Sequence, residues 1–488
     1  MKKYNYILLL VGTLTTIGLS SCKDSFLEVD QKQQIVATKV ADYELLMNGR
    51  DLYDYPYEGG WQATVLLGDE LSAESDFLSG NGTIQTQRLF RYEDVVYDEG
   101  QDAYDMKYFH NNLYHCNKII NEVMDATEGT DQQKQVLIAE ARASRAWVYL
   151  QLINFYAKPY NASTAANDPG YPIIKTADIS IRYFSRNTVQ EVYDFILEDL
   201  NAALPVLPVT PKAATRMGKA AAEAVLGKVY LYMGRFPEAL THFDASFAAI
   251  AQQNNPARLY DLNETFGPDG SFLPIDEYMG PNGIGNNPND YTESVLVRTH
   301  YVGGWQPIGN DGMVLTEATQ ALFGSTDLRL NFYTVNTPDV EPNPSGRLRR
   351  YSTTYNKFGV QLPDLYLMRA ECRARQNNLT GALQDLLTLR NNRMPAEDAA
   401  VPANVSNNQR DLLHFIIDER IREFASEGYR WFDMRRLHKD PLFSSVLPPH
   451  IEHHNDGTQT AYPLREERLT LRLPSLYIAA NPGMPNNP

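Results

Sequence analysis

The feature that most constrains the fold of this chain is the spacing of small and aromatic residues in "AVLGKVYLYMGRFPEALTHF", residues 224–243. The positions that carry the spacing are Leu226, Gly227, Tyr230, Gly234, Ala239 and Phe243. They recur at helical intervals on either side of Gly234, a residue type that commonly ends one helix before another begins. Small residues let two helices approach closely, while Tyr and Phe fill the groove between them. The stretch therefore predicts two helices packed as a pair.

The same spacing matches the tetratricopeptide pattern L-G-x-x-Y…A-x-x-x-F. Residues 364–390 repeat it weakly, with Tyr366, Ala370, Ala382 and Leu386 in the corresponding places. Other tetratricopeptide-like helix pairs are predicted near 107–157, 187–247 and 411–438, and Asn187 or Thr188 with Glu191 predicts a capped start for one helix. We therefore expect an all-α fold, a tetratricopeptide-like helix-pair scaffold. The loop-rich tract 251–355 would be functional or disordered, as loops this long usually are, and its aromatic residues favour a function.

The N-terminus predicts export and a lipid anchor. Lys2 and Lys3 precede the apolar run "YILLLVGTLTTIGL", and small residues lead to Cys22 in "LSSC". This ending resembles a bacterial lipobox, in which the cysteine is lipidated; the alternative is an ordinary signal peptide with a coincidental cysteine. We predict a signal peptide over 1–21, a lipidated tether over 22–35 and one domain over 36–488. The run is too short to span a membrane, and no later segment is long enough.

Charge and cysteine content exclude other classes of protein. The net charge of −16 argues against nucleic acid or an anionic membrane surface as partner, because no basic patch offsets it. Beyond Cys22 there are only Cys116 and Cys372. Two cysteines do not make a disulfide framework, so we expect both to be buried and reduced.

The densest cluster of chemistry-bearing residues is "REFASEGYRWFDMRR", residues 422–436. Its carboxylates, Glu423, Glu427 and Asp433, could serve a glycosidase, which needs two of them across a sugar. Basic residues at helical spacing favour a structural role instead: Arg422 would pair with Asp418, and Arg430 and Arg436 with Asp433. Such pairs lower carboxylate pKa values, the opposite of what a general acid requires. An apolar stripe from Ile421 to Phe432 also predicts one packed helix face.

Several segments together resemble the SusD/RagB family of outer-membrane nutrient-binding lipoproteins. These are "RNTVQEVYDFILEDLNAALPVLP" (186–208), "GKAAAEAVLGKVYLYMG" (218–234), "ERIREFASEGYRWFDMRR" (419–436) and the terminal "LRLPSLYIAANPGMPNNP". The third is closest to the family pattern, through Glu419, Arg420, Glu423, Phe424, Glu427, Gly428, Arg430, Trp431, Asp433 and Arg436. In the fourth, Tyr477 replaces the usual acid and a final Gly-Tyr is missing, so the terminal packing could differ from the family's.

The resemblance implies a helical protein whose loop-rich half is the ligand-binding half. Such a protein sits over a SusC-like, TonB-dependent transporter and binds an oligosaccharide or polysaccharide. Some relatives bind peptides, and this alternative stays open. The resemblance implies no catalytic activity and no cofactor. A lipid-anchored α-helical glycoside hydrolase and a scaffold that binds only protein are weaker alternatives.

Aromatic residues in loops are the best candidates for ligand contact. Aromatics make up 11% of the chain, and sugar rings stack on them through their C–H faces. Two segments, "YDYPYEGGW" (53–61) and "HYVGGWQP" (300–307), set aromatics beside Gly-Gly pairs, which allow an exposed ring. The candidate ligand-binding residues are Tyr55, Tyr57, Trp61, Tyr301 and Trp305. Trp147 and Trp431 fall within helical patterns and are expected in the core.

Two polar clusters are weaker candidates. His450, His453 and His454 with Glu452 could hold a metal, but loop histidines beside Pro-Pro would have no fixed geometry, and we predict no metal site. The acidic run Asp69, Glu70, Glu74 and Asp76 could hold a cation or bind sugar hydroxyls. A solvated helix end or loop is the simpler interpretation of that run.

Overall fold

The protein is described by a computed structural model that covers residues 37–55, 61–80, 82–101, 104–287, 289–301 and 312–488. Its main helices are α2 (Val40–Met47), α3 (Trp61–Leu67), α5 (Ile84–Phe90), α6 (Tyr104–Glu122), α7 (Asp131–Tyr156), α8 (Val189–Ala203), α9 (Lys219–Tyr232), α10 (Phe236–Ile250), α13 (Leu362–Arg375), α14 (Leu379–Arg390), α16 (Gln409–Phe424) and α17 (Arg430–Leu437). Shorter helical segments are α4 (Ser75–Gly80), α11 (Leu262–Thr265), α12 (Glu317–Gln320), α15 (Ala403–Ser406), α18 (Ser475–Ala480), η2 (Arg50–Leu52), η3 (Val123–Asp125), η5 (Leu328–Phe332) and η6 (Glu466–Leu469). The predicted all-α class is confirmed, because helices form the bulk of the fold.

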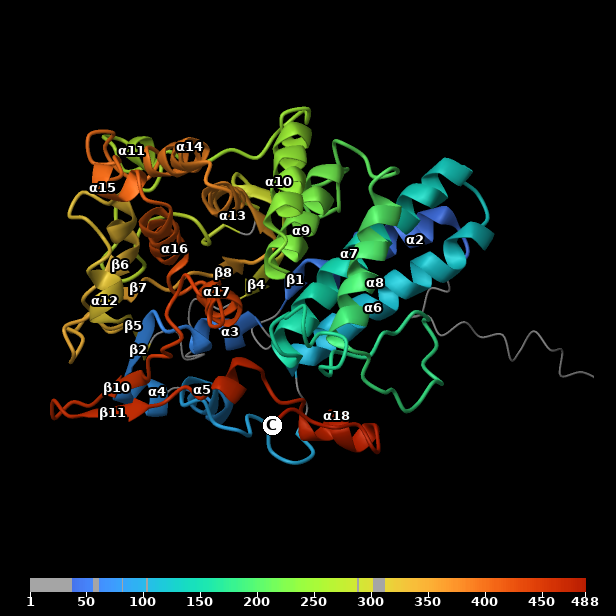
Figure 1. Cartoon of the computed structure of the whole chain (residues 1–488), viewed down its shortest axis with the longest axis horizontal. Coiled ribbons are helices and arrows are strands. Elements are labelled where there is room, and N and C mark those ends of the chain that lie inside the picture. The colour runs from blue at the N-terminus through green and yellow to red at the C-terminus, as the bar shows by residue number, and fades with distance from the viewer. Residues whose placement is uncertain (1–36, 56–60, 81, 102–103, 288, 302–311) are drawn as a thin grey trace, which may run out of the picture.

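The helices pack in sequence order across the molecule. In Figure 1, α6, α7 and α8 lie together on the right, α9 and α10 stand in the middle, and α13, α14 and α16 continue to the upper left. The α9–α10 pair has the predicted close contact: a Cβ on Gly227 would lie 2.5 Å from the Phe243 ring. The second pair, α13 and α14, buries Ala370, Ala382 and Leu386 completely.

Local sequence explains where these helices begin. Thr188 caps α8 by accepting a hydrogen bond from the Glu191 backbone N–H at 3.1 Å, and the Glu191 carboxylate accepts one from the Thr188 N–H at 2.7 Å. This confirms the predicted capping box. Cys116 and Cys372 are buried free thiols, as expected, and burial raises the pKa of Cys116 to about 12.

The strands are short and come from the segments that the sequence marks as loops. They are β1 (Asp54–Tyr55), β2 (Leu71–Glu74), β3 (Ser294–Leu296), β4 (Thr299–Tyr301), β5 (Met313–Leu315), β6 (Tyr333–Thr334), β7 (Arg349–Arg350), β8 (Tyr355–Lys357), β9 (Val360–Gln361), β10 (His450–His453) and β11 (Gln459–Tyr462). They form small sheets in the orders β1-β4-β8, β11-β10-β2-β5, β3-β9 and β6-β7. Segments far apart in sequence thus meet in these sheets: β2, β5, β10 and β11 lie at the lower left of Figure 1, whereas β1, β4 and β8 lie near its centre.

A large hydrophobic core joins the helix pairs to these sheets. Trp147 and Trp431 both belong to it, as predicted. A second cluster fixes the N-terminal helix α2 through Tyr43 and Met47, which pack against residues of α6 and α7. None of the helices in the described ranges is long and apolar enough to cross a membrane.

Candidate functional site

The β1-β4-β8 sheet brings the two aromatic Gly-Gly segments together. β1 and β4 pair in parallel, with Asp54 opposite Thr299 and Tyr55 opposite His300. β8 flanks β4 in antiparallel register, with Tyr301 opposite Tyr355. Paired parallel strands run in the same direction. Tyr55 and Tyr301 therefore end their strands at the same end of the sheet, although about half the chain separates them.

Four part-exposed tyrosines surround this sheet, and we call them the tyrosine face: Tyr53, Tyr291, Tyr301 and Tyr355. The rings of Tyr301 and Tyr355 meet edge to face with centroids 5.4 Å apart. Partial burial, together with the neighbouring tyrosines and the charge of Asp54, raises the pKa values of Tyr291 and Tyr355. Their hydroxyls therefore stay protonated at neutral pH and can donate hydrogen bonds.

A small polar group lies beside the tyrosine face. Arg50 contacts the Asp54 carboxylate at 2.6 Å, and the Thr299 hydroxyl donates to the same carboxylate at 3.2 Å. Rings, hydroxyls and one ion pair on an open surface suit a ligand with apolar faces and many hydroxyls. This is the chemistry expected for a carbohydrate.

One of the predicted ligand contacts is wrong. Tyr55 is fully buried, its ring packs against Phe109 and Phe358 at centroid distances of 5.5 and 5.2 Å, and its hydroxyl contacts the side chain of Asn112. Strand alternation is the reason: in β1, Tyr55 points into the core, while its neighbour Asp54 reaches the surface. Tyr55 therefore supports the sheet from beneath and does not meet a ligand.

The other candidates keep their status as predictions. Tyr301 is part-exposed and belongs to the tyrosine face. Trp61 is the first residue of α3, but its side chain lies outside the described residues, as do Tyr57 and Trp305 entirely. Sequence reasoning did not find Tyr291 and Tyr355. Tyr355 meets Tyr301 only through the pairing of β8 with β4, and Tyr291 lies in the loop before β3.

The segment 422–436 is two helices and a turn. α16 ends at Phe424, Ser426 and Gly428 have positive φ angles of 65° and 88°, and α17 begins at Arg430. The expected apolar stripe along one helix face is therefore wrong, because the turn divides its residues between two helices. Phe424 and Trp431 are nonetheless buried in the core.

The charges of this segment form a buried network of ion pairs, which we call the α16–α17 ion-pair cluster. Glu419 contacts Arg329, Arg390 and Arg422; Glu423 contacts Arg329 and Arg393; Asp433 contacts Arg420 and Arg436; Glu371 contacts Arg436 and Arg375; Glu427 contacts Arg350; Arg430 contacts Asp69. The Asp433–Arg436 pair confirms the prediction. The other predicted partners are wrong, since Arg422 pairs with Glu419 and Arg430 reaches across to Asp69 beside β2.

The pKa values of two carboxylates in the cluster are shifted in opposite directions. Burial opposes ionisation of Glu423, but Arg393 and Arg329 outweigh it and lower the Glu423 pKa. For Glu427, burial outweighs the attraction of Arg350, and the pKa is raised. The expectation that pairing lowers every carboxylate pKa in this segment is therefore wrong for Glu427.

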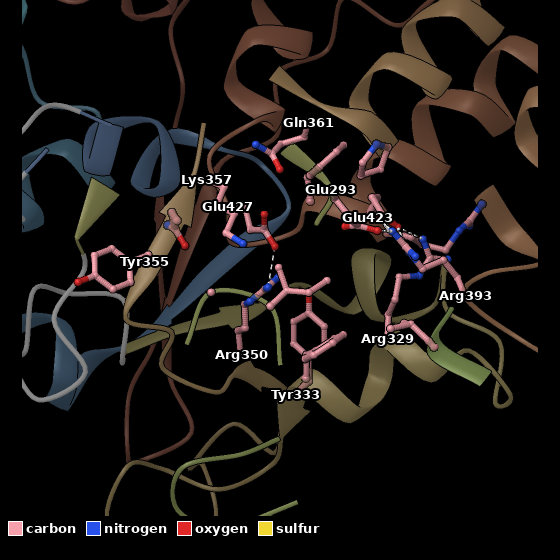
Figure 2. Close-up of a pocket in the computed structure, with 18 residues that line it drawn as sticks. Glu293, Arg329, Tyr333, Arg350, Tyr355, Lys357, Gln361, Arg393, Glu423 and Glu427 are labelled. Carbon is pink, nitrogen blue, oxygen red and sulfur yellow. Dashed lines mark hydrogen bonds and ion pairs between the residues drawn. The ribbon is translucent and has the colours of Figure 1, made fainter. Parts of the chain in front are cut away.

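Figure 2 shows the small cavity that these carboxylates line. Glu427 faces Arg350 on one side, Glu423 lies with Arg329 and Arg393 on the other, and Tyr355 stands apart toward the tyrosine face. The cavity volume is about 50 Å³, which holds a few waters but no sugar ring. Each carboxylate that lines the cavity forms an ion pair with an arginine. The polar groups around the cavity therefore bind one another.

The two weaker polar clusters are also buried in part. His450 and His453 lie in strand β10, which pairs with β2, so the expected loop is wrong. The His450 ring nitrogens lie 2.7 Å from the Phe90 carbonyl oxygen and 2.7 Å from the Tyr92 hydroxyl. In the part of the chain that the structure describes, no three His, Cys, Asp or Glu residues group as metal ligands.

The expected solvated helix end or loop is found for only part of the acidic run, since Asp76 is exposed at the start of α4 while Glu70 and Glu74 are buried. Glu70 and Glu74 are both 1% exposed: Glu74 ends β2, an inner strand of its sheet, and Glu70 directly precedes that strand. Burial, reinforced by Asp69, raises the pKa of Glu70 to about 8. Glu70 is thus a neutral carboxylic acid at pH 7.

Comparison with known proteins assigns the family. The model described as "Starch-binding associating with outer membrane" matches residues 25–231, and the "SusD family" model matches residues 347–484. SusD-like protein P2 of Formosa agariphila is 25% identical over 540 residues, with both chains covered completely. The chain belongs to the SusD family, which confirms the resemblance seen in its sequence.

Solved structures share the fold. A SusD superfamily protein from Bacteroides thetaiotaomicron has a TM-score of 0.69 at 18% identity, covering 92% of this chain and 100% of its own. A putative sugar binding protein from Bacteroides vulgatus has a TM-score of 0.63 at 20% identity, covering 93% and 99%. These similarities establish the architecture of the chain.

Proposed function

We propose that this protein is a cell-surface binding lipoprotein that captures an oligosaccharide or polysaccharide and delivers it to a TonB-dependent outer-membrane transporter. The observation that carries the proposal is the parallel pairing of β1 with β4, which joins the two aromatic segments at one part-exposed tyrosine face. Membership of the SusD family supports it, and so does the fold shared with a putative sugar binding protein.

Binding would take place without bond cleavage. A sugar ring would stack on Tyr301 or Tyr355, while tyrosine hydroxyls and the Arg50–Asp54 pair would bind its hydroxyl groups. Tyr57, Trp61 and Trp305 are proposed as further contacts, because they follow β1 and β4 directly in the sequence. The Arg-held carboxylates of the α16–α17 ion-pair cluster supply no pair of free acids for hydrolysis.

The anchor and the transporter are part of the same proposal. Cys22 would carry the lipid and hold the chain on the outer membrane, and a SusC-like barrel would receive the glycan. In cells, Cys22→Ala should release the protein from the membrane fraction and abolish palmitate incorporation. Pull-down of the membrane-anchored protein should recover a TonB-dependent barrel, and recovery of none would contradict the delivery step.

The binding test uses a glycan array followed by calorimetry on the best glycan. Tyr301→Ala and Trp305→Ala should each weaken binding about tenfold, since each removes a stacking surface. Tyr183→Ala is the matched control, because Tyr183 is 73% exposed and belongs to a different surface. A peptide library screened in parallel tests the peptide alternative. Binding of peptides alone, or equal loss in the Tyr183 variant, would contradict the proposal.

A further inference from the structure

A second, larger cavity lies away from the tyrosine face. It has a volume of about 910 Å³, at the upper end of the roughly 300–1,000 Å³ typical of small-molecule sites. The segment after α7, the turn between α9 and α10, the end of α17 and the C-terminal residues 486–488 form its walls. Tyr160, Tyr232 and Phe236 give it aromatic surface. It shares no residue with the tyrosine face.

Most cations that line this cavity are held by acids. Lys158 contacts Asp168 at 2.9 Å and Lys439 contacts Glu466 at 2.7 Å. Arg375 contacts Asp440 at 2.6 Å. Arg436 also lines the cavity, and its guanidinium is shared by Glu371 and Asp433.

Arg435 differs from all of these. It is 2% exposed, and in the part of the chain that the structure describes its guanidinium donates one hydrogen bond, from Nη2 to the Ala157 carbonyl oxygen at 2.5 Å. Within the described ranges, Nε and Nη1 of Arg435 have no hydrogen-bond partner. Its guanidinium lies 5.9 Å from the centre of the Trp431 ring. Burial lowers the pKa of Arg435 to about 10, whereas Asp69 raises the pKa of Arg430 on the same helix.

A buried guanidinium without an anion is costly, because its lost hydration is not replaced. A carboxylate recovers much of that loss, since it accepts two parallel hydrogen bonds from the planar fork of an arginine. The unpaired Nε and Nη1 atoms are buried in the cavity wall, so they donate to a carboxylate once the Arg435 side chain turns toward the cavity. Aromatic walls beside the arginine would pack against a ring or alkyl body that carries the carboxylate.

We propose that this cavity is a second ligand site, which binds a small organic carboxylate through Arg435 and packs its body against Tyr160, Tyr232 and Phe236. The carboxylate could belong to a uronic acid sugar or to an aliphatic acid, and both present the same group to Arg435. The proposal is independent of glycan capture at the tyrosine face, because the two sites have no residue in common.

The test is calorimetric titration of the purified protein, tagged on its N-terminal side because residues 486–488 line the cavity. The probes are a hexuronate disaccharide and octanoate, and each is compared with its own uncharged amide. At least one acid should bind, its amide should bind about tenfold more weakly or worse, and Arg435→Met should remove the difference. The probe that binds identifies the source of the carboxylate.

Two controls keep the result interpretable. Arg435→Met removes an unpaired buried charge, so thermal unfolding should occur at the same or a higher temperature, and a folded variant will report on binding. Tyr301→Ala should change acid binding by less than about twofold, since distant sites are additive. The proposal is overturned if neither acid binds, if an amide binds as well as its acid, if Arg435→Met retains binding, or if Tyr301→Ala abolishes it. Loss of glycan capture in Tyr301→Ala alone would bear only on the proposed function.

Discussion

The α16–α17 ion-pair cluster and the tyrosine face use polar groups in opposite ways. In the cluster, Glu419 is completely buried and is held by three arginines at 2.6–2.8 Å. At the tyrosine face, Arg50 and Asp54 are just as close, at 2.6 Å, but the Arg50 side chain is 73% exposed. The same contact therefore serves two purposes, and burial decides which.

This difference shows why a high density of charged residues is a poor marker of a binding site. Charges that are taken out of water must be paired. The Arg and Glu side chains of a buried helix therefore pair with other charged side chains of the protein and are not available to a ligand. Part-exposed tyrosines leave ring faces and hydroxyls available to a ligand. Four predictions test the comparison.

The largest effect is expected from breaking the buried cluster. Glu419→Ala would leave Arg329, Arg390 and Arg422 without their shared carboxylate, and should cost about 3–5 kcal/mol of unfolding free energy in urea titrations. Glu317→Ala is the control, because the Glu317 side chain is 90% exposed and should change stability by less than about 1 kcal/mol. Equal losses in both variants would show that burial does not separate the two kinds of pair.

Acid should act on the same cluster. Burial opposes ionisation of Glu371, but Arg436 and Arg375 lower its pKa from 4.5 to about 2. A depressed folded-state pKa gives stability that is present above pH 4.5 and is lost as the pH falls toward 2. Glu371 alone should contribute roughly 3 kcal/mol to this loss. Urea titrations from pH 6 to pH 2 measure it, and a Glu371→Gln variant should lack this part of the pH dependence.

The tyrosine face should show the reverse pattern, with lost binding and little lost stability. Tyr355→Ala removes the edge-to-face partner of Tyr301 and should weaken glycan binding about fivefold, while stability falls by about 1 kcal/mol. Tyr355→Phe keeps the ring and separates stacking from hydrogen bonding. If the Phe variant bound no better than the Ala variant, the hydroxyl and not the ring would hold the ligand.

The smallest effect is expected at the exposed ion pair. Arg50→Ala should change unfolding free energy by less than about 1 kcal/mol, because an exposed pair gains little over water. Any effect on glycan affinity should be weaker still at high salt, which screens exposed charges. A stability loss comparable to that of Glu419→Ala would contradict the comparison.

Local sequence was enough to predict where helices form and which of them pair. The spacing around Gly227 predicted the α9–α10 pair, and Thr188 with Glu191 predicted the start of α8, because caps and helix-pair packing depend on residues close in the chain. Ion-pair partners were harder, since a long arginine side chain can reach another element: Arg430 binds Asp69, which is 361 residues away. For the same reason, the sequence did not indicate that two nitrogens of Arg435 would lack hydrogen-bond partners among the described residues.

The sequence by itself determined the helical scaffold, the family and the two aromatic segments, since each of these is written in residues that are neighbours or lie at helical spacing. Only the tertiary structure decided that those segments meet through β1 and β4, that Tyr55 faces the core, and that Tyr291 and Tyr355 join Tyr301. The physical reason is that strands of two or three residues carry almost no pattern of their own. Their pairing and the side that each residue faces are set by the core against which they pack.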